Sequence, residues 1–509
     1  MLSEAENLMG CRVVIAVAIL AATFLAGRAD EADVRQALAL QKTVQAAIRD
    51  AAPAIACILV SRSDVYARIT PRPSADKPGE LGDFDANLLH RLPGASDEDL
   101  ASWRRKLDLA DPGIVPESYG SGVVIDPVGL ILTNYHVVRD ATKVFVRLPG
   151  REGSYADIHA ADARADLAVL RLRSRKLPGG LKTIALGEAE HCERGQFVLS
   201  IANPFAAGFR DGQPSASWGI LSSIRRRIPG NSNELDRVKP LHQYGTLLQT
   251  DARLNLGCSG GALINLKGEM IGLTTALAAI QGGETPGGFA VPMDAGMRRI
   301  VDVLRRGEEI DYGFLGVSFD QGPVRDGEGV RLISFVRGSP AERDGQLQPG
   351  DRILEVNGKP IHESDDLFLA LGSALAGSKV RLQVRRTRPG FPQEVDITLA
   401  KFLSPGKRIY SSMGKRPMFR GLRVDHASLL VQPTANQFSR IPMGVMVCAV
   451  QPGSPAAAVP LKVGDVIAEV QGRPVASPAD FYREIERRVG PIELTLDTSG
   501  RRPKVTLGQ

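Results

Sequence analysis

The chain has 509 residues, enough for roughly three domains of ~150 residues each. With 43% hydrophobic and 24% charged residues, its composition is that of an ordinary globular protein. The net charge of +6 is small for this length, and no run of Lys and Arg is interleaved with aromatic residues, so we expect no nucleic-acid partner.

The first feature along the chain is an apolar run, Val13–Gly27. Its fifteen residues are short for a membrane-spanning helix and fit the core of a signal peptide. Glu4 and Glu6 stand where a signal peptide usually carries positive charge, so Met9 is an alternative start. We expect residues 1–29 to be a signal peptide or a membrane anchor, with export to the periplasm or cell envelope; a buried helix is the alternative.

Residues 31–118 combine a predicted helix, a predicted strand and a long loop. Apolar residues recur at helical spacing from Glu31 to Asp50, and Pro53 ends this helix. Ile55–Val60 follows as the first predicted barrel strand. The segment 61–118 is polar and rich in Pro, Asp and Gly, which predicts a long loop with a short helix within it.

The region from Tyr119 to Ile280 has the pattern of an all-β fold. Short apolar runs alternate with glycine-bearing turns, which is typical of β-barrels or sandwiches. A helix predicted over Met293–Arg306 closes this region.

Three residues of this region form a catalytic pattern. His136 follows an apolar stretch, Asp166 heads an apolar run, and Ser259 lies in Gly-Cys-Ser-Gly-Gly at 257–261. Each alone also fits a structural role, as a core-edge histidine, a strand start or a small-residue turn. An α/β-hydrolase has the order Ser, Asp, His. The order here is His, Asp, Ser, which is that of the double-barrel serine proteases.

These residue types predict acyl transfer by a serine nucleophile. Ser259 is a poor nucleophile unless a base takes its proton, which is the predicted role of His136. Asp166 would fix the histidine tautomer and stabilise the imidazolium that forms. The oxyanion hole is predicted at Gly257, Cys258 and Ser259, with the N–H groups of Gly257 and Ser259 as donors.

The remaining histidines and cysteines suggest no metal chemistry. The cysteines show neither a CxxC pair nor zinc-ligand spacing, so we predict no metal, no cofactor and no obligatory disulfide framework. The other histidines have no setting like that of His136 and are predicted to be surface or loop residues: His90, His159, His191, His242, His362 and His426.

The C-terminal third contains an internal repeat. The sequence Gly-Ser-Pro-Ala occurs at 338–341 and again at 453–456, and Gly-Asp occurs at 350–351 and at 464–465. Each unit reads as strand, helix start, turn, strand, turn, helix and strand. Two copies of one small domain are therefore predicted.

In their order, these motifs resemble the HtrA (DegP/DegQ-type) family of serine endopeptidases. The resemblance implies a mainly β fold, with a chymotrypsin-like double β-barrel protease domain over 30–308 that includes the long loop 61–118. Two α+β PDZ-like domains follow at 311–401 and 418–505, joined by a linker at 402–417. The family usually has Asn where this chain has Cys258. The matching segments are Ser121–Asp126, Leu132–His136, Asp166–Leu170, Ile201–Phe205, Leu248–Asp251 and Gly257–Gly272.

The resemblance also implies peptide binding. A PDZ domain adds a peptide as a strand to a sheet edge and captures its carboxylate in a loop of backbone N–H groups. The implied loop of the first repeat consists of Phe314, Leu315, Gly316 and Val317. In the second repeat Arg420 replaces the apolar residue expected before the glycine, so that repeat is the weaker candidate, and docking against a neighbouring subunit is its alternative role.

Regulation and assembly are implied in the same way. In the family, the loop between the Asp and Ser motifs senses bound peptide and orders the oxyanion hole. Here that loop contains Arg225, Arg226 and Arg227, for which solvated surface charge is the alternative. Family members are built on trimers, so a homotrimer or a multiple of trimers is expected.

The function expected from the sequence is that of an exported, ATP-independent serine endopeptidase that degrades unfolded or damaged proteins. The first alternative is a chaperone or adaptor that binds unfolded chains or C-terminal peptides without cutting them. A PDZ scaffold without enzymatic activity is the second.

Overall fold

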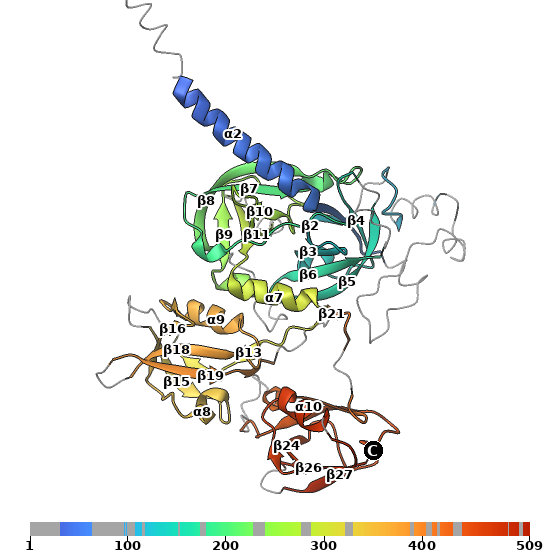
Figure 1. Cartoon of the computed structure of the whole chain (residues 1–509), viewed down its shortest axis with the longest axis vertical. Coiled ribbons are helices and arrows are strands. Elements are labelled where there is room, and N and C mark those ends of the chain that lie inside the picture. The colour runs from blue at the N-terminus through green and yellow to red at the C-terminus, as the bar shows by residue number, and fades with distance from the viewer. Residues whose placement is uncertain are drawn as a thin grey trace, which may run out of the picture.

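The computed structural model (Figure 1) describes the chain from residue 31 onward. The apolar run 13–27, Arg227 and most of the loop 61–118 lie outside the described residues. The described ranges are 31–63, 96, 98, 107–113, 118–150, 153–173, 180–226, 240–275, 287–320, 329–386, 391–403, 410–414, 418–430, 440–486, 488–497 and 502–508.

A long helix, α2 (Glu31–Ala51), precedes the barrels. It projects away from them in Figure 1 and buries only residues near its C-terminal end, Ala47 and Ala51. The 3₁₀ turn Ala52–Ala54, which contains Pro53, separates it from β1 (Ile55–Ser61). The predicted helix and strand are therefore confirmed.

The first barrel is an antiparallel sheet in the order β5-β4-β1-β2-β3-β6, closed by pairing of β5 with β6. A four-residue helix, α5 (Tyr135–Val138), follows β3 directly. The remaining strands are β2 (Ser118–Asp126), β3 (Leu130–Asn134), β4 (Lys143–Arg147), β5 (Ser154–Asp162) and β6 (Leu167–Leu172).

The second barrel closes in the order β10-β11-β12-β9-β8-β7. Helix α7 (Ala295–Arg305) follows it, and the Asp294 carboxylate caps this helix by accepting from the N–H of Met297 at 2.8 Å. The strands are β7 (Phe197–Ala202), β8 (Ser215–Arg226), β9 (Leu247–Thr250), β10 (Ala262–Ile264), β11 (Met270–Thr275) and β12 (Gly288–Pro292). The short 3₁₀ turns are η3 (Ala189–His191), η4 (Pro204–Ala206) and η5 (Leu241–Tyr244).

The first C-terminal domain has a sheet in the order β14-β15-β16-β18-β19, so β14 is an edge strand. Its core is formed by residues of this domain alone. The elements are β13 (Gly313–Phe314), β14 (Val317–Phe319), β15 (Val330–Phe335), α8 (Pro340–Asp344), β16 (Arg352–Val356), β17 (Lys359–Pro360), α9 (Ser364–Gly372), β18 (Lys379–Arg385), β19 (Gln393–Thr398) and β20 (Ala400–Lys401).

The second C-terminal domain repeats this plan in the order β22-β23-β24-β26-β27, with a separate core. The repeat read from the sequence is thus a repeat of structure. Its last strand continues beyond residue 505. The elements are β22 (Leu422–His426), η6 (Ala427–Leu430), β23 (Val445–Val450), β24 (Val466–Val470), β25 (Arg473–Pro474), α10 (Pro478–Glu486), β26 (Ile492–Leu496) and β27 (Lys504–Leu507).

The segment 402–417 makes a contact that the sequence did not predict, and one prediction about a residue beside it needs correction. This predicted linker returns to the first barrel, where β21 (Tyr410–Ser411) pairs with β5. His159, predicted at the surface or in a loop, lies in β5 with 2% exposure, and its Nδ1 is 2.6 Å from the hydroxyl of Ser412. A pairing between segments some 250 residues apart leaves no local signal in the sequence.

Candidate active site

Helix α5 carries His136 immediately after β3. The ring Nδ1 lies 2.8 Å from Asp166 Oδ2, and the backbone N–H of His136 donates to Asp166 Oδ1 at 3.0 Å. A proton on Nδ1, shared with this carboxylate, leaves Nε2 as the acceptor nitrogen. Within the described part of the chain, Nε2 is buried and has no hydrogen-bond partner. The ring is held in the tautomer that a general base requires.

Asp166 lies in the turn just before β6 and is fixed by contacts with the end of β3. The pairing of Asn134 with Leu167 brings the two segments side by side. Asn134 Nδ2 donates to Asp166 Oδ2 at 3.2 Å, and the N–H of Tyr135 donates to the Asp166 carbonyl at 3.1 Å. Asp166 has φ of 54°, a conformation that costs energy for a residue other than glycine. These contacts hold the carboxylate in a single position, with 4% exposure.

Ser259 lies in a tight turn before β10. Gly257 has φ of 92°, and a Cβ atom there would approach the carbonyl oxygen of Asn203 to 2.6 Å, so this position requires glycine. Cys258 lies within the predicted oxyanion hole, and its N–H, which was not among the two predicted donors, donates to the Asn255 carbonyl at 3.0 Å. The N–H of Gly257 makes no hydrogen bond to any residue that the structure describes.

The side chain of Cys258 is buried next to the nucleophile position. Its Sγ accepts from the N–H of Asn255 at 3.4 Å, and burial raises the pKa of this thiol. The thiol is therefore protonated near neutral pH, which disfavours reaction with oxidants.

Strand β2 joins the two halves of the site. The N–H of Ser121 donates to the carbonyl of Ser259 at 2.8 Å, and the Ser121 hydroxyl donates to the carbonyl of Gly257 at 2.7 Å. The N–H of Asn203, at the end of β7, donates to the same hydroxyl at 2.8 Å. The first barrel, which supplies His136 and Asp166, is thus bonded directly to the turn of Ser259 in the second.

The predicted peptide loop of the first C-terminal domain leads into its edge strand β14. Gly316 has φ of 81°, and a Cβ atom there would collide with the side chain of Ser339. Phe319 of β14 packs edge-to-face on Phe368 of α9, with ring centroids 4.8 Å apart. Strand β14 and helix α9 are therefore neighbours, as a peptide groove of this fold requires.

The equivalent edge of the second domain is closed by its own groups. The N–H of Leu422 donates to the carbonyl of Phe419 at 2.9 Å, which shuts the loop into a tight turn. The N–H of Val424, on edge strand β22, donates to the hydroxyl of Tyr482 on α10 at 3.3 Å. Arg420 Nη1 donates to the carbonyl of Gly508 at 2.6 Å, so the residue that departs from the family pattern belongs to this closed arrangement.

Helix α9 also contacts the protease domain. Arg225, at the end of β8, forms an ion pair with Asp366, whose other oxygen accepts from the backbone N–H of His362 at 2.8 Å. The ring of Tyr244 stacks on Phe368 with a centroid distance of 5.1 Å. Arg225 thus pairs with a side chain of the first PDZ-like domain. Arg226 is exposed.

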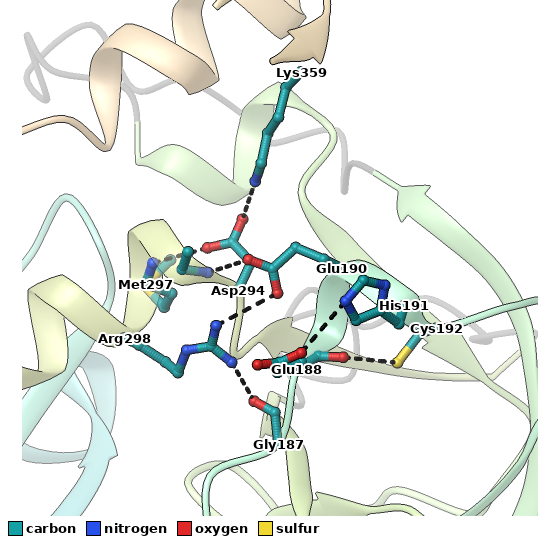
Figure 2. A network of polar contacts seen from close by, with 10 residues as sticks. Gly187, Glu188, Glu190, His191, Cys192, Asp294, Met297, Arg298 and Lys359 are labelled. Atoms are coloured by element: carbon teal, nitrogen blue, oxygen red, sulfur yellow. Dashed lines mark hydrogen bonds and ion pairs between the residues drawn. The ribbon is translucent and has the colours of Figure 1, made fainter. Parts of the chain in front are cut away.

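A second contact between the same domains surrounds the start of α7. Figure 2 shows Asp294 between Met297 and Lys359, whose Nζ is 3.5 Å from Asp294 Oδ2. Glu190 accepts from the N–H of Ala295 at 2.5 Å and lies 3.8 Å from Arg298. A mostly apolar cavity of about 500 Å³ separates the two contacts and is lined by residues of both domains. The interface is therefore bonded at its edges and loosely packed at its centre.

Two general properties of the described residues bear on the sequence predictions. None of the helices in these ranges is long and apolar enough to span a membrane. His, Cys, Asp and Glu side chains form no cluster of three or more suited to a metal ion in the same ranges.

Comparison with known proteins identifies three domains along the chain. Residues 120–273 match a trypsin-like peptidase domain, and residues 334–386 and 421–489 each match a PDZ domain. Two solved structures cover about 70% of this chain. They are the HtrA-type protease AlgW with a tripeptide (24% identity, 71% of this chain and 96% of that chain, TM-score 0.44) and the serine endoprotease from Yersinia pestis (25% identity, 70% and 97%, TM-score 0.41).

Curated relatives match over most of their length. A "Probable periplasmic serine endoprotease DegP-like" of Ectopseudomonas mendocina (strain ymp) is 32% identical over 380 residues, which cover 72% of this chain and 74% of that protein. A protein of the same description from Halomonas elongata is 31% identical over 391 residues, covering 74% and 76%. These matches favour proteolysis over the chaperone alternative. The chain belongs to the HtrA family of DegP-like serine endoproteases, with a double β-barrel protease domain followed by two PDZ domains.

Proposed function

We propose that this chain cleaves unfolded or damaged proteins in the periplasm with His136, Asp166 and Ser259 as its catalytic triad. The observation that carries the assignment is the paired contact of Asp166 with both the ring and the backbone of His136, at 2.8 and 3.0 Å. It leaves the buried Nε2 as the only basic nitrogen of that ring. The turn of Ser259 is bonded to the same barrel through Ser121.

The proposed mechanism proceeds through an acyl-enzyme. His136 Nε2 takes the proton of the Ser259 hydroxyl as its oxygen attacks the scissile carbonyl, and the imidazolium then protonates the leaving amine. Asp166 stabilises the imidazolium through the Nδ1 contact. The N–H groups of Gly257 and Ser259 stabilise the tetrahedral oxyanion. Water then hydrolyses the ester, with His136 again acting as base.

Peptide binding is proposed for the first PDZ domain only. Its loop, residues 314–317, precedes the edge strand β14, whereas the equivalent edge of the second domain is occupied by Tyr482. Arg225 connects α9 to the end of β8, so peptide at the first domain would bias the sensor loop that follows β8. In this proposal Arg226 has no regulatory role and is only a solvated surface charge.

The location and the assembly of this chain are proposed from its family. The relatives are named periplasmic, and residues 1–29 are proposed to direct export, either as a cleaved signal peptide or as an anchor. A homotrimer, or a multiple of it, is proposed as the working assembly. Light scattering of the purified chain measures its molar mass, and a monomer throughout the micromolar range would contradict this part of the proposal.

The direct test of the enzymatic function is cleavage of unfolded casein by the purified chain, with Ser259→Ala as the comparison. The parent is expected to degrade casein without ATP, and Ser259→Ala is expected to bind it without degrading it. Degradation by Ser259→Ala at the parent's rate would refute the assignment of the nucleophile.

A further inference from the structure

The helix that carries His136 is too short to be stable without contacts from outside it. Helix α5 has only four residues, and no side chain caps its N-terminus. The carbonyls of the last turn of a helix have no partners within the helix, and a single turn is unstable in isolation. Groups outside the helix must therefore fix its position, and with it the position of the imidazole.

The side chain of Arg62 supplies these missing partners. Its Nη2 donates to the carbonyls of Val137 at 2.8 Å and His136 at 3.4 Å, and its Nε donates to the carbonyl of Arg139 at 2.8 Å. Its Nη1 donates to the hydroxyl of Ser118 at 2.6 Å. A guanidinium presents five N–H donors in one rigid plane, which suits a group of neighbouring carbonyls better than an ammonium does.

Arg62 and Asp166 hold opposite ends of the same residue. Asp166 accepts from the backbone N–H of His136, while Arg62 donates to its carbonyl. We propose that Arg62 is a positioning residue, which locks helix α5 from its C-terminal end and so fixes the position of His136 Nε2. This inference rests on the proposed role of His136 and assigns to Arg62 no contact with substrate.

Steady-state cleavage of a fluorogenic peptide by the full chain tests the proposal. A misplacement of about 1 Å in a catalytic group can cost on the order of 100-fold in rate. We expect Arg62→Ala to lower kcat by about 10- to 100-fold, with a much smaller change in KM, because substrate binding does not involve this side chain. Arg62→Lys should recover only part of the loss, since the N–H donors of an ammonium leave one nitrogen and cannot reproduce the planar spread of the guanidinium donors.

Ser118→Ala is the matched control. Among the hydrogen bonds of Arg62 to described residues, it removes the one that does not involve helix α5 and its C-cap, and it should keep kcat close to that of the parent. Guanidinium ion at concentrations that do not denature the parent should restore part of the activity of Arg62→Ala and should not raise that of Ser118→Ala, with sodium chloride as the salt control.

Three results would overturn the proposal. The first is a kcat of Arg62→Ala within twofold of the parent, and the second is a loss confined to KM. The third is a loss of activity that guanidinium does not restore and that parallels a lower thermal midpoint, which would assign Arg62 to stability alone. If Arg62→Ala does not fold, Arg62→Lys decides by the same kcat comparison. An inactive parent would instead contradict the proposed function, so the two failures are distinguishable.

Discussion

At the scale of single residues, the site depends on a strained aspartate held by several contacts. Asp166 adopts a positive φ and is nearly fully buried. Its two oxygens serve His136 in different ways, one at the ring and one at the backbone. A substitution that preserves shape but replaces one oxygen by an N–H₂ group therefore changes the ring tautomer more than the fold.

Asp166→Asn is predicted to lower kcat by about 10⁴-fold, because an amide in place of the carboxylate favours the wrong histidine tautomer. The measurement is the kcat of peptide cleavage, with circular dichroism to verify the fold. A folded Asp166→Asn enzyme with kcat within tenfold of the parent would exclude this residue from the triad.

His159 predicts a pH dependence of stability. Burial lowers its pKa below the ordinary value of 6.5, the nearby Arg171 lowers it further, and the carbonyl of Arg305 acts in the opposite direction. The unfolded chain therefore binds more protons than the folded chain between the depressed pKa and 6.5, so stability is complete above this window and is lost as pH falls through it. Ser412 would then lose its neutral partner.

The expected result is a thermal midpoint that falls on acidification below about pH 6.5, with a smaller fall in His159→Gln. Differential scanning calorimetry at matched ionic strength measures both. An identical pH dependence in the two proteins would show that other groups control acid stability.

Sequence motifs point to the proposed triad, whereas the groups that support it leave no such signal. His136, Asp166 and Ser259 stand in short motifs whose order is specific. Arg62 has no such motif, because most of its acceptors are backbone carbonyls, which every residue has. These carbonyls also lie beyond a long loop in the sequence. His159 also has no sequence signal, because its partner Ser412 lies far along the chain in a segment with the composition of an ordinary polar linker.

At the scale of elements, the two PDZ domains offer a matched pair of glycines. Gly316 and Gly421 both have φ of 81°, and a Cβ at either would collide with a serine, Ser339 or Ser454. The local damage caused by a side chain should therefore be alike in the two domains. Their peptide edges differ at one equivalent position. The second domain has Tyr482 there, whereas the first domain has Phe368, which lacks a hydroxyl.

Gly316→Asp is predicted to abolish binding of peptides with apolar C-termini, while Gly421→Asp leaves it at the parent level. Isothermal titration calorimetry with one such peptide measures the affinity of all three proteins. Equal weakening by the two substitutions would assign peptide capture to both domains, and an unchanged affinity of Gly316→Asp would remove it from the first.

The elements themselves were predictable to different extents. Strands and glycine turns of the barrels follow from period and composition, and the repeat follows from its recurring Gly-Asp and Gly-Ser-Pro-Ala sequences. Strand β21 could not be predicted in this way. Its two residues, Tyr410 and Ser411, are too few to show an apolar alternation, and they become a strand only by pairing with β5.

At the scale of the whole molecule, charged contacts are among those that connect the domains. Lys401 lies 2.8 Å from both Asp311 and Asp425; although its burial opposes the charge, these carboxylates raise its pKa, so the ammonium remains charged at the junction. Arg225 and Lys359 bond the first PDZ domain to the protease domain on either side of the cavity. In Figure 1, α9 faces the protease domain across this interface.

Arg225→Ala is predicted to remove the stimulation of cleavage by activating peptides while basal cleavage persists, because it breaks the ion pair to the helix beside the peptide edge. Arg226→Ala, whose exposed side chain makes no ion pair in the described ranges, is the control and should be stimulated like the parent. Initial rates against peptide concentration decide. Undiminished stimulation of Arg225→Ala would place the coupling elsewhere.

The central claim is that Ser259 is a nucleophile activated by His136, and covalent labelling tests it most directly. A fluorophosphonate probe should label the folded parent once, with the adduct located at Ser259 by mass spectrometry of the digested protein. His136→Ala should slow the labelling by orders of magnitude, and Ser259→Ala should abolish it. An adduct at another residue, or labelling of His136→Ala at the parent's rate, would contradict the account.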